Sequence, residues 1–432
     1  MKKISRSTKI LISILLILCV IATVLVVKDI NEQNTKLNED LSSNASSTLE
    51  TENDNDISNP NENTQANVET NTTQTTTTNP PENDDEDVSN ELFAKYYEQA
   101  EQIMKDMTIE EKVAQMFLVR YPDNGVINQI KNEAPGGYIL FGKDFDNETK
   151  ESILKELTEN QQASKIGLIF GVDEEGGTVV RVSSHKAFRS SKFQSPQELW
   201  KQGQLPKILE DSKEKSELLK SIGLNMNLAP VVDVPTKTTS FIYKRSYGRG
   251  AEKTATYVSR LIQTMNEDNM ISVMKHFPGY GDNVDTHTGI AIDERPYSTF
   301  ETSDFLPFES GIEAGGPCIL VSHNVVKAMD ENYPASLSEN VHKILREDLK
   351  FSGIVMTDDL SMDAVKTYAE NGDVAVQAVL AGNDMLISSD FVEQKQEILK
   401  AIEDKKINEN LINKAVRRIL SMKIAYGIID NI

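Results

Sequence analysis

The sequence is poor in cysteine, tryptophan and histidine, and it has few positive charges for its acid content. Its 432 residues include two cysteines, one tryptophan and five histidines, and 45 Lys and Arg stand against 67 Asp and Glu. The net charge of −22 argues against a nucleic-acid partner, which would require a basic surface. Because Cys19 lies in an apolar run, we expect no disulfide within the folded part and predict that Cys318 fills the core.

The first 28 residues have the pattern of a membrane anchor. Residues 1–9 carry four basic residues and no acid, and the apolar run Ile10–Val27 follows. As a helix this run is just long enough to span a hydrocarbon core of about 30 Å. The basic flank predicts a cytoplasmic N-terminus, and hence a single-pass cell-membrane protein whose main domain is extracellular. A cleaved signal peptide and a lipoprotein attached at Cys19 are the alternatives.

Residues 29–91 have the composition of a disordered linker. They contain 16 acids and one base, many Asn, Thr and Ser, and almost no large apolar residues. Such a segment cannot bury enough surface to offset the entropy of ordering it. We therefore predict three parts, which are an anchor over 1–28, an acidic tether over 29–91 and a single catalytic domain over 92–432.

From residue 92 onward, short apolar runs alternate with longer helical patterns. The strand-like runs are Met116–Val119, Gly137–Phe141, Gly167–Val172, Asn225–Val232, Ile271–His276, Cys318–Ser322, Gly353–Thr357 and Asp384–Ile387. Continuously apolar strands are typical of parallel sheets that are buried on both faces. Eight such runs, separated by helical stretches such as Lys253–Asp268 and Ser338–Asp348, predict a (β/α)₈ TIM-type barrel. A doubly wound open sheet would show the same alternation.

Many of these runs end in a polar or charged side chain. The residues concerned are Asp173, Asp233, Lys275, His276, His323 and Asp358. Barrel enzymes build their active sites at the carboxyl-terminal ends of the strands, where the βα loops begin. The pattern therefore favours an enzyme whose site lies at that end, although we expect Asp233 to be structural and leave His323 out of the catalytic set.

Two segments carry the residues suited to chemistry. The first runs from Lys275 to Asp282 as Lys-His-Phe-Pro-Gly-Tyr-Gly-Asp, and Asp285-Thr286-His287 follows. A carboxylate two residues from an imidazole can orient it and raise its proton affinity, which suits general acid/base work. In the second segment, Asp358 ends a strand and can attack an anomeric carbon, whereas Asp359 is expected to turn away.

These segments resemble the bacterial β-N-acetylglucosaminidases (β-hexosaminidases, NagZ type) of glycoside hydrolase family 3. The similarity also covers Met107–Gln115, Gly136–Gly142, Asp173–Arg181, Asn227–Asp233, Arg245–Gly248 and Ala381–Leu386. The resemblance implies that Asp358 is the nucleophile, His287 the general acid/base and Asp285 its partner. It further implies a sugar site made by Asp173, Arg181, Arg245, Lys275 and His276. No metal and no organic cofactor are expected.

The chain departs from the family pattern at a few positions. Tyr280 replaces a loop histidine, Thr286 replaces a serine, and Lys244 adds a positive charge before Arg245. The segment 173–178 also lacks the usual Gln and Arg. These differences leave the substrate preference open.

The resemblance implies a retaining exo-enzyme that releases terminal β-linked N-acetylglucosamine from peptidoglycan-derived glycans, through a monomeric catalytic head. The sequence leaves open whether polymers or muropeptides are preferred, and whether water or phosphate is the acceptor. A metal-dependent barrel hydrolase is an alternative, although the first strand lacks a His-x-His pair. Two further alternatives are a non-catalytic receptor for the cell wall and a family 3 β-glucosidase. Such β-glucosidases usually take their general acid/base residue from a second domain. We expect no such domain beyond the closing helix Lys414–Gly427.

Overall fold

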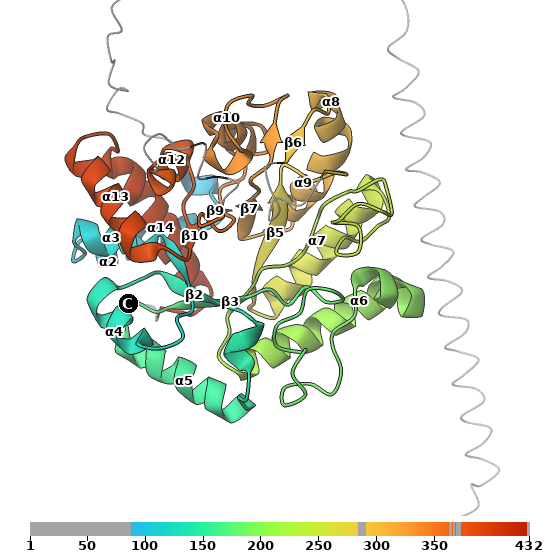
Figure 1. The fold of residues 1–432 in the computed structure, drawn as a ribbon, viewed down its shortest axis with the longest axis horizontal. Coiled ribbons are helices and arrows are strands. Elements are labelled where there is room, and N and C mark those ends of the chain that lie inside the picture. The colour runs from blue at the N-terminus through green and yellow to red at the C-terminus, as the bar shows by residue number, and fades with distance from the viewer. Residues whose placement is uncertain (1–87, 284–290, 363–364, 366–367, 369–372, 430–432) are drawn as a thin grey trace, which may run out of the picture. The chain divides into compact units, whose positions relative to one another are not determined.

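Figure 1 shows a computed structural model of the chain, which describes residues 88–429 except 284–290, 363–364, 366–367 and 369–372. The predicted anchor over 1–28 and nearly all of the linker over 29–91 lie outside the described residues, as do Asp285 and His287. Among the helices that are described, none combines the length and the apolar character needed to cross a bilayer. The anchor and the membrane location therefore stay predictions.

Eight parallel strands form the centre of the described fold (Figure 1). The strands are β1 (Phe117–Arg120), β2 (Gly137–Leu140), β3 (Ile169–Val172), β4 (Met226–Asn227), β5 (Ile271–Phe277), β7 (Cys318–Val321), β9 (Ile354–Thr357) and β10 (Leu386–Ser388). Their spatial order is β10-β1-β2-β3-β4-β5-β7-β9. All eight predicted runs form strands, and their sequential order around the sheet is that of a barrel.

The sheet closes on itself at one thin seam between β9 and β10. A single parallel bridge joins Met356 to Met385 there. The main-chain N–H of Thr357 donates to the oxygen of Met385 at 3.1 Å, and the N–H of Met385 donates to the oxygen of Val355, also at 3.1 Å. The open-sheet alternative is therefore wrong, and the chain forms a nearly closed parallel barrel of the TIM type.

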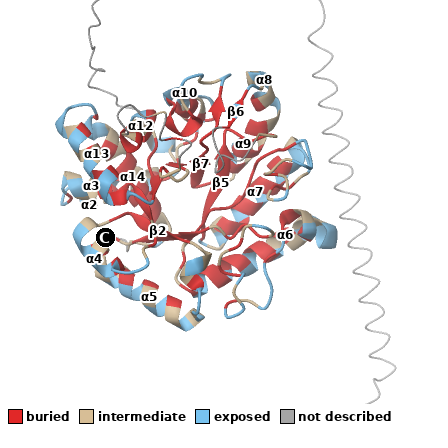
Figure 2. Ribbon diagram, in the orientation of Figure 1, coloured by how far each residue is buried: buried red, intermediate tan, exposed pale blue. Residues whose placement is uncertain are grey.

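Helices surround the strands on the outside. They are α2 (Tyr97–Met104), α3 (Ile109–Gln115), α4 (Val126–Glu133), α5 (Lys150–Ala163), α6 (Pro196–Ser221), α7 (Ala251–Glu267), α8 (Tyr297–Thr299), α9 (Phe305–Glu313), α10 (Glu339–Lys343), α12 (Val374–Ala381), α13 (Phe391–Glu403) and α14 (Glu409–Ala425). In α7, Val258, Leu261, Ile262 and Met265 repeat at helical spacing and are buried. Figure 2 shows the strands buried and the exposed residues on the outer helix surfaces and loops.

Local sequence signals explain several of the element boundaries. Thr108 caps α3 through the reciprocal bonds of a capping box with Glu111, as its spacing predicts. The predicted run Asn225–Val232 forms a regular ladder only at Met226–Asn227, and a bridge between Val231 and Lys275 resumes the pairing. Pro230, which lies between the two, has no N–H to donate to a ladder.

A second, two-stranded parallel sheet was not predicted. It pairs β6 (Ile292–Asp293) with β8 (Val325–Val326). Both strands are too short for a period-two pattern to be visible in the sequence. This small sheet fixes the chain that follows residues 284–290 to the chain that follows β7.

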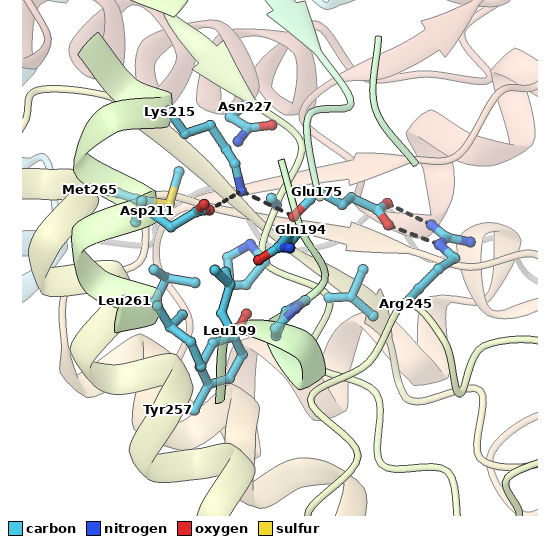
Figure 3. Close-up of a pocket in the computed structure, with 16 residues that line it drawn as sticks. Glu175, Gln194, Leu199, Asp211, Lys215, Asn227, Arg245, Tyr257, Leu261 and Met265 are labelled. Carbon is cyan, nitrogen blue, oxygen red and sulfur yellow. Dashed lines mark hydrogen bonds and ion pairs between the residues drawn. The ribbon is translucent and has the colours of Figure 1, made fainter. Parts of the chain in front are cut away.

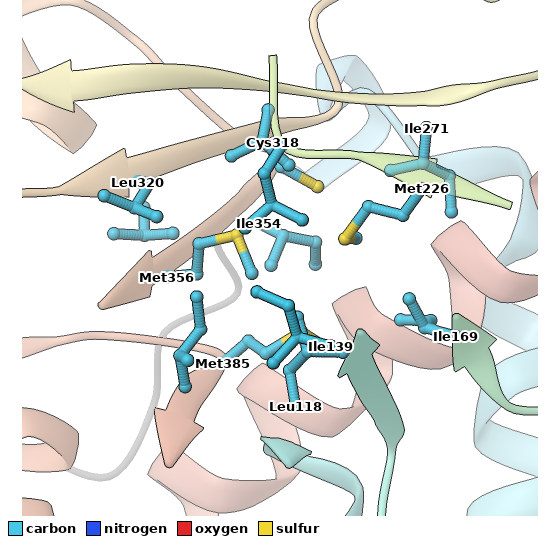
Figure 4. Packing of buried hydrophobic residues seen from close by; sticks show 14 of the residues in the cluster. Leu118, Ile139, Ile169, Met226, Ile271, Cys318, Leu320, Ile354, Met356 and Met385 are labelled. Atoms are coloured by element: carbon cyan, nitrogen blue, oxygen red, sulfur yellow. The ribbon is translucent and has the colours of Figure 1, made fainter. Parts of the chain in front are cut away.

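The interior of the barrel is filled by apolar side chains from every wall. Figure 4 shows Leu118, Ile139, Ile169, Met226, Ile271, Cys318, Leu320, Ile354, Met356 and Met385 packed together. Cys318 is fully buried as predicted, and burial raises the pKa of its thiol well above the usual value. The centre is thus a packed core, which leaves the ends of the strands for chemistry.

Candidate active site

Four charged side chains, from the ends of β3 and β5 and from the loop between β4 and α7, form one ion-paired cluster. The Nζ atom of Lys275, near the end of β5, lies 2.7 Å from Oδ1 of Asp173 and 2.8 Å from Oε1 of Glu175. Arg245 donates from Nε and Nη2 to the two Glu175 oxygens at 2.9 and 2.7 Å. The Glu175 carboxylate therefore bridges two cations that are 30 residues apart in the chain.

Because Glu175 and Lys275 are buried, the charge of each strongly affects the pKa of the other. Lys275 is 2% exposed and Glu175 is 6% exposed. Burial alone raises the pKa of Glu175, but the charges of Lys275 and Arg245 outweigh it and hold that pKa far below the usual range. Burial lowers the pKa of Lys275, and Asp173 with Glu175 reverses this so that it is raised overall. Glu175 and Lys275 are therefore both ionised at neutral pH.

His276 joins this cluster to Asp233, which follows β4. The Nδ1 atom of His276 lies 2.8 Å from Oδ2 of Asp233, and its Nε2 lies 3.3 Å from Nη2 of Arg245. Asp233 also accepts the main-chain N–H groups of His276 at 3.2 Å and Tyr280 at 2.8 Å. The ring of Tyr280 packs edge-on against His276, with centroids 5.0 Å apart. Asp233 is structural, as predicted, because it positions the imidazole and the loop after β5.

Arg181 lies beside the cluster with part of its hydrogen-bonding capacity unused. Its Nη2 is 3.6 Å from Oδ2 of Asp173, and its buried Nε has no hydrogen-bond partner among the described residues. The guanidinium lies 5.5 Å from the ring centroid of Phe141, and Arg120 lies 4.3 Å from the same ring. One buried donor of Arg181 is therefore left unsatisfied by the described residues.

Two residues of this region were not among the predicted site residues. Glu175 bridges Lys275 and Arg245. Glu174 is fully buried and accepts the main-chain N–H groups of Arg181 at 2.8 Å and of Val182 at 2.7 Å. The run of three acids directly after an apolar strand was the available signal, because buried acids at a strand end need cationic or N–H partners.

A small enclosed hollow lies behind Glu175, between the loop after β3 and helices α6 and α7 (Figure 3). Its volume of about 30 Å³ is too small for a sugar ring. Lys215 borders the hollow, donates to the main-chain oxygen of Glu175 at 3.1 Å and lies 3.4 Å from Asp211. The hollow is thus part of the support behind the charged cluster.

Asp358 follows β9 at the same end of the barrel. It is half-buried, and its main-chain N–H donates to the oxygen of Val321 at 3.2 Å. The N–H of Asp359 donates to Oδ1 of Asp358 at 2.9 Å. The Asp359 carboxylate instead accepts from the Ser361 N–H and the Ser389 hydroxyl, each at 2.9 Å. Asp359 therefore turns away, as predicted, and Asp358 remains at the strand end.

His323 is fully buried and makes contacts typical of a structural residue. Its Nδ1 lies 2.7 Å from the Ser336 hydroxyl, and its Nε2 lies 3.1 Å from the main-chain oxygen of Asp359. In the part of the chain that the structure describes, no group of three or more His, Cys, Asp or Glu side chains could hold a metal ion.

The structure brings five predicted sugar-binding residues into one network. They are Asp173, Arg181, Arg245, Lys275 and His276. Asp358 belongs to the same end of the barrel, and Asp285 and His287 lie outside the described residues. Charged and hydrogen-bonding groups that project from parallel strand ends are suited to holding a polar ligand at the barrel mouth.

Comparisons with known proteins agree with this arrangement. The family described as Glycosyl hydrolase family 3 N terminal domain matches residues 108–422. A β-hexosaminidase of Nitrosomonas eutropha (strain DSM 101675 / C91 / Nm57) is 29% identical over 285 residues, which cover 64% of this chain and 79% of that protein. A β-hexosaminidase of Methylobacillus flagellatus is 28% identical over 288 residues, covering 63% of this chain and 78% of that one.

Solved structures show the same fold. A glycoside hydrolase family 3 β-N-acetylglucosaminidase from Paenibacillus sp. str. FPU-7 is 27% identical with a TM-score of 0.69, and the match covers 74% of this chain and 63% of that one. This chain thus spans less than two thirds of the Paenibacillus protein. A β-N-acetylhexosaminidase from Beutenbergia cavernae DSM 12333 shares the fold with a TM-score of 0.66 at 24% identity, covering 74% of this chain and 99% of that one.

The fold and site define a (β/α)-barrel enzyme with a cluster of charges at the carboxyl-terminal ends of its strands. Because the family match covers most of the chain, the chain belongs to glycosyl hydrolase family 3. It is a glycoside hydrolase, and the resemblance to the β-hexosaminidases of that family is confirmed.

Proposed function

We propose that the protein is a retaining exo-β-N-acetylglucosaminidase that releases terminal N-acetylglucosamine from peptidoglycan-derived glycans outside the cell. The observation that carries the proposal is the single network of Asp173, Arg181, Arg245, Lys275 and His276 at the strand ends, with a buried donor of Arg181 left without a partner. Such a network of fixed charges matches the many hydroxyl and amide groups of an aminosugar. The names of the similar proteins support this choice of sugar.

The proposed reaction has two displacements. The Asp358 carboxylate attacks the anomeric carbon while His287 protonates the leaving oxygen, so that the C–O bond to the aglycone breaks and a glycosyl ester forms. His287 then removes a proton from water, and the water attacks the same carbon and releases Asp358. Two inversions leave the β configuration unchanged. Asp285 supports the imidazolium that forms in the first step.

The decisive experiment compares substitutions at two adjacent acids. Asp358→Ala should abolish turnover of a chromogenic β-N-acetylglucosaminide, with a loss of at least about 10⁴-fold, because no carboxylate remains to form the glycosyl ester. Asp359→Asn is the matched control and should retain activity, since within the described part of the chain the Asp359 side chain hydrogen-bonds to Ser361 and Ser389 and to none of the residues proposed to bind the sugar. Turnover by a well-folded Asp358→Ala variant would show that the nucleophile is misassigned.

The same assay separates the remaining alternatives. A β-glucosidase would prefer the glucoside over the N-acetylglucosaminide, and a metal-dependent hydrolase would lose activity after exhaustive chelation. Product analysis in phosphate buffer distinguishes free N-acetylglucosamine from the sugar phosphate. Incubation with wall digests, followed by mass analysis of released sugars, identifies the natural substrate.

A further inference from the structure

Arg295 joins the chain before residues 284–290 to the chain after them. Its Nη2 donates to the main-chain oxygen of Gly279 at 2.9 Å, ahead of that segment. Its Nε and Nη2 donate to the carboxylate of Asp293 at 2.8 to 3.0 Å, behind the segment. Its Nη1 lies 3.0 Å from both oxygens of Asp304. One side chain therefore links both ends of the stretch that contains Asp285 and His287.

The turn at residues 279–281, which precedes residues 284–290, packs directly against Arg295 and Asp304. Gly279 has φ 122°, and a Cβ at this position would lie 2.3 Å from Oδ1 of Asp304. Gly281 has φ 54°, and a Cβ there would lie 2.5 Å from Cζ of Arg295. Only glycine fits these conformations at such short range. The two glycines allow the entry turn to rest on the Arg295–Asp304 pair.

Other contacts fix each end to the barrel. Before the segment, Asp282 accepts the main-chain N–H groups of Thr236 and Lys237 at 3.0 and 2.9 Å. After it, the N–H of Val325 donates to the oxygen of Ala291 at 2.8 Å, within the β6–β8 sheet. Arg295 is the one described side chain that hydrogen-bonds to both ends. Fixing the ends of a short stretch restricts the conformations open to it.

We infer that Arg295 is a positioning residue for the acid/base step, acting through the two ends of the segment that carries His287. The inference rests on the proposed function, in which His287 transfers a proton to the leaving oxygen. Proton transfer requires hydrogen-bond distance, and a misplacement of about 1 Å can cost about 100-fold in rate. Arg295 contacts neither Asp358 nor the Lys275 cluster within the described residues, so its loss should weaken protonation more than nucleophilic attack.

The test compares two arginines that have similar surroundings. Arg295→Lys and Arg295→Met are set beside Arg346→Lys. Arg346 also donates to both main-chain and carboxylate oxygens. Its acceptors are the main-chain oxygens of Phe351 and Gly353 and the buried carboxylate of Asp384, which lie before the amino-terminal ends of β9 and β10. The side chains of Arg295 and Arg346 are 25% and 20% exposed, so both substitutions disturb a similar degree of burial.

Each variant is assayed with a dinitrophenyl and a phenyl β-N-acetylglucosaminide, whose leaving groups differ in their need for a proton. For Arg295→Met, kcat/KM should fall about 100-fold with the phenyl glycoside and less than about tenfold with the dinitrophenyl glycoside, because only the first needs general acid catalysis. Azide, which attacks the glycosyl ester without base assistance, should raise turnover and yield the β-glycosyl azide. KM should change little, and Arg295→Lys should show a smaller loss of the same pattern.

Three outcomes would overturn the inference: equal losses on both substrates, no loss at all, or the same leaving-group dependence in Arg346→Lys. If Arg295→Met does not fold, the losses of Arg295→Lys and Asp293→Asn on the two glycosides are compared with those of Arg346→Lys instead. A wild-type chain that cleaves neither glycoside refutes the proposed function instead, so the two failures are distinguishable.

Discussion

Asp233 accepts a hydrogen bond from Nδ1 of His276, and this contact determines which ring nitrogen carries the proton. A carboxylate can only accept, so Nδ1 must hold a hydrogen, whereas the Arg245 guanidinium can only donate, so Nε2 must be its acceptor. These two contacts therefore favour the Nδ1–H tautomer of His276. Lys275, Arg245 and Arg181 are the Lys and Arg side chains among the residues proposed to bind the sugar.

Asp233→Asn should disturb this tautomer. The amide can donate to Nδ1, which then places the hydrogen on Nε2 against the donor of Arg245. We expect kcat/KM to fall about tenfold or more, the equivalent of one or two hydrogen bonds at about 1 kcal/mol each. Steady-state kinetics measure the loss, and ¹⁵N NMR of the imidazole shows which nitrogen is protonated. An unchanged ¹⁵N pattern would contradict the assigned tautomer.

Glu175→Gln should cost both stability and substrate binding. It leaves Lys275 and Arg245 buried with Asp173 as the remaining near carboxylate, and breaking a buried pair costs about 3 kcal/mol or more. We also expect KM to rise, because Lys275 and Arg245, which are proposed to bind the sugar, lose the carboxylate that fixes their positions. Denaturant unfolding and Michaelis kinetics measure the two effects.

Glu133→Gln provides the matched control for that variant. Glu133 pairs with Lys395, which is 5% exposed, in a contact between α4 and α13. This control should lose stability without a change in KM. A Glu175→Gln variant with unchanged KM would show that the bridge is purely structural.

Lys423 should make the stability of the domain depend on pH. It is fully buried in α14, and its Nζ donates to the side chain of Gln115 at 2.7 Å and the oxygen of Gly136 at 2.8 Å. Burial lowers its pKa to about 7. Above pH 7 the unfolded chain holds a proton that the folded chain has lost, so the free energy of unfolding rises with pH toward the usual lysine pKa, by up to about 1.4 kcal/mol per pH unit.

The measurement is denaturant unfolding of the wild type and Lys423→Met between pH 6 and 9. The variant loses two hydrogen bonds at every pH, so the slopes are compared rather than the absolute stabilities. The wild type should gain stability relative to the variant as the pH rises through 7. Parallel pH profiles would contradict a neutral Lys423.

The sequence predicts the barrel well because its strands are buried on both faces and therefore continuously apolar. It also predicts the residues that follow those strands, since parallel strands place their ends together. The bridge made by Glu175 could not be predicted, because it depends on partners 70 and 100 residues further along the chain. The β6–β8 sheet could not be predicted either, because each of its strands has two residues and is too short to show a period-two alternation. Asp285 and His287 lie outside the described residues, so their roles remain predictions.

The seam between β9 and β10 lies next to the proposed nucleophile, so the two parts of the proposed site differ in how their strands are paired. The residues proposed to bind the sugar come from the ends of β3 and β5 and from the loops that follow β3 and β4, and ion pairs join them to one another. Asp358 follows β9 beside the seam, where one ladder bridge and a few main-chain hydrogen bonds join β9 to β10. The proposed nucleophile therefore stands beside the least regularly paired junction of the barrel, whereas the strands nearest the proposed sugar-binding residues, β3, β4 and β5, pair with one another through ladders.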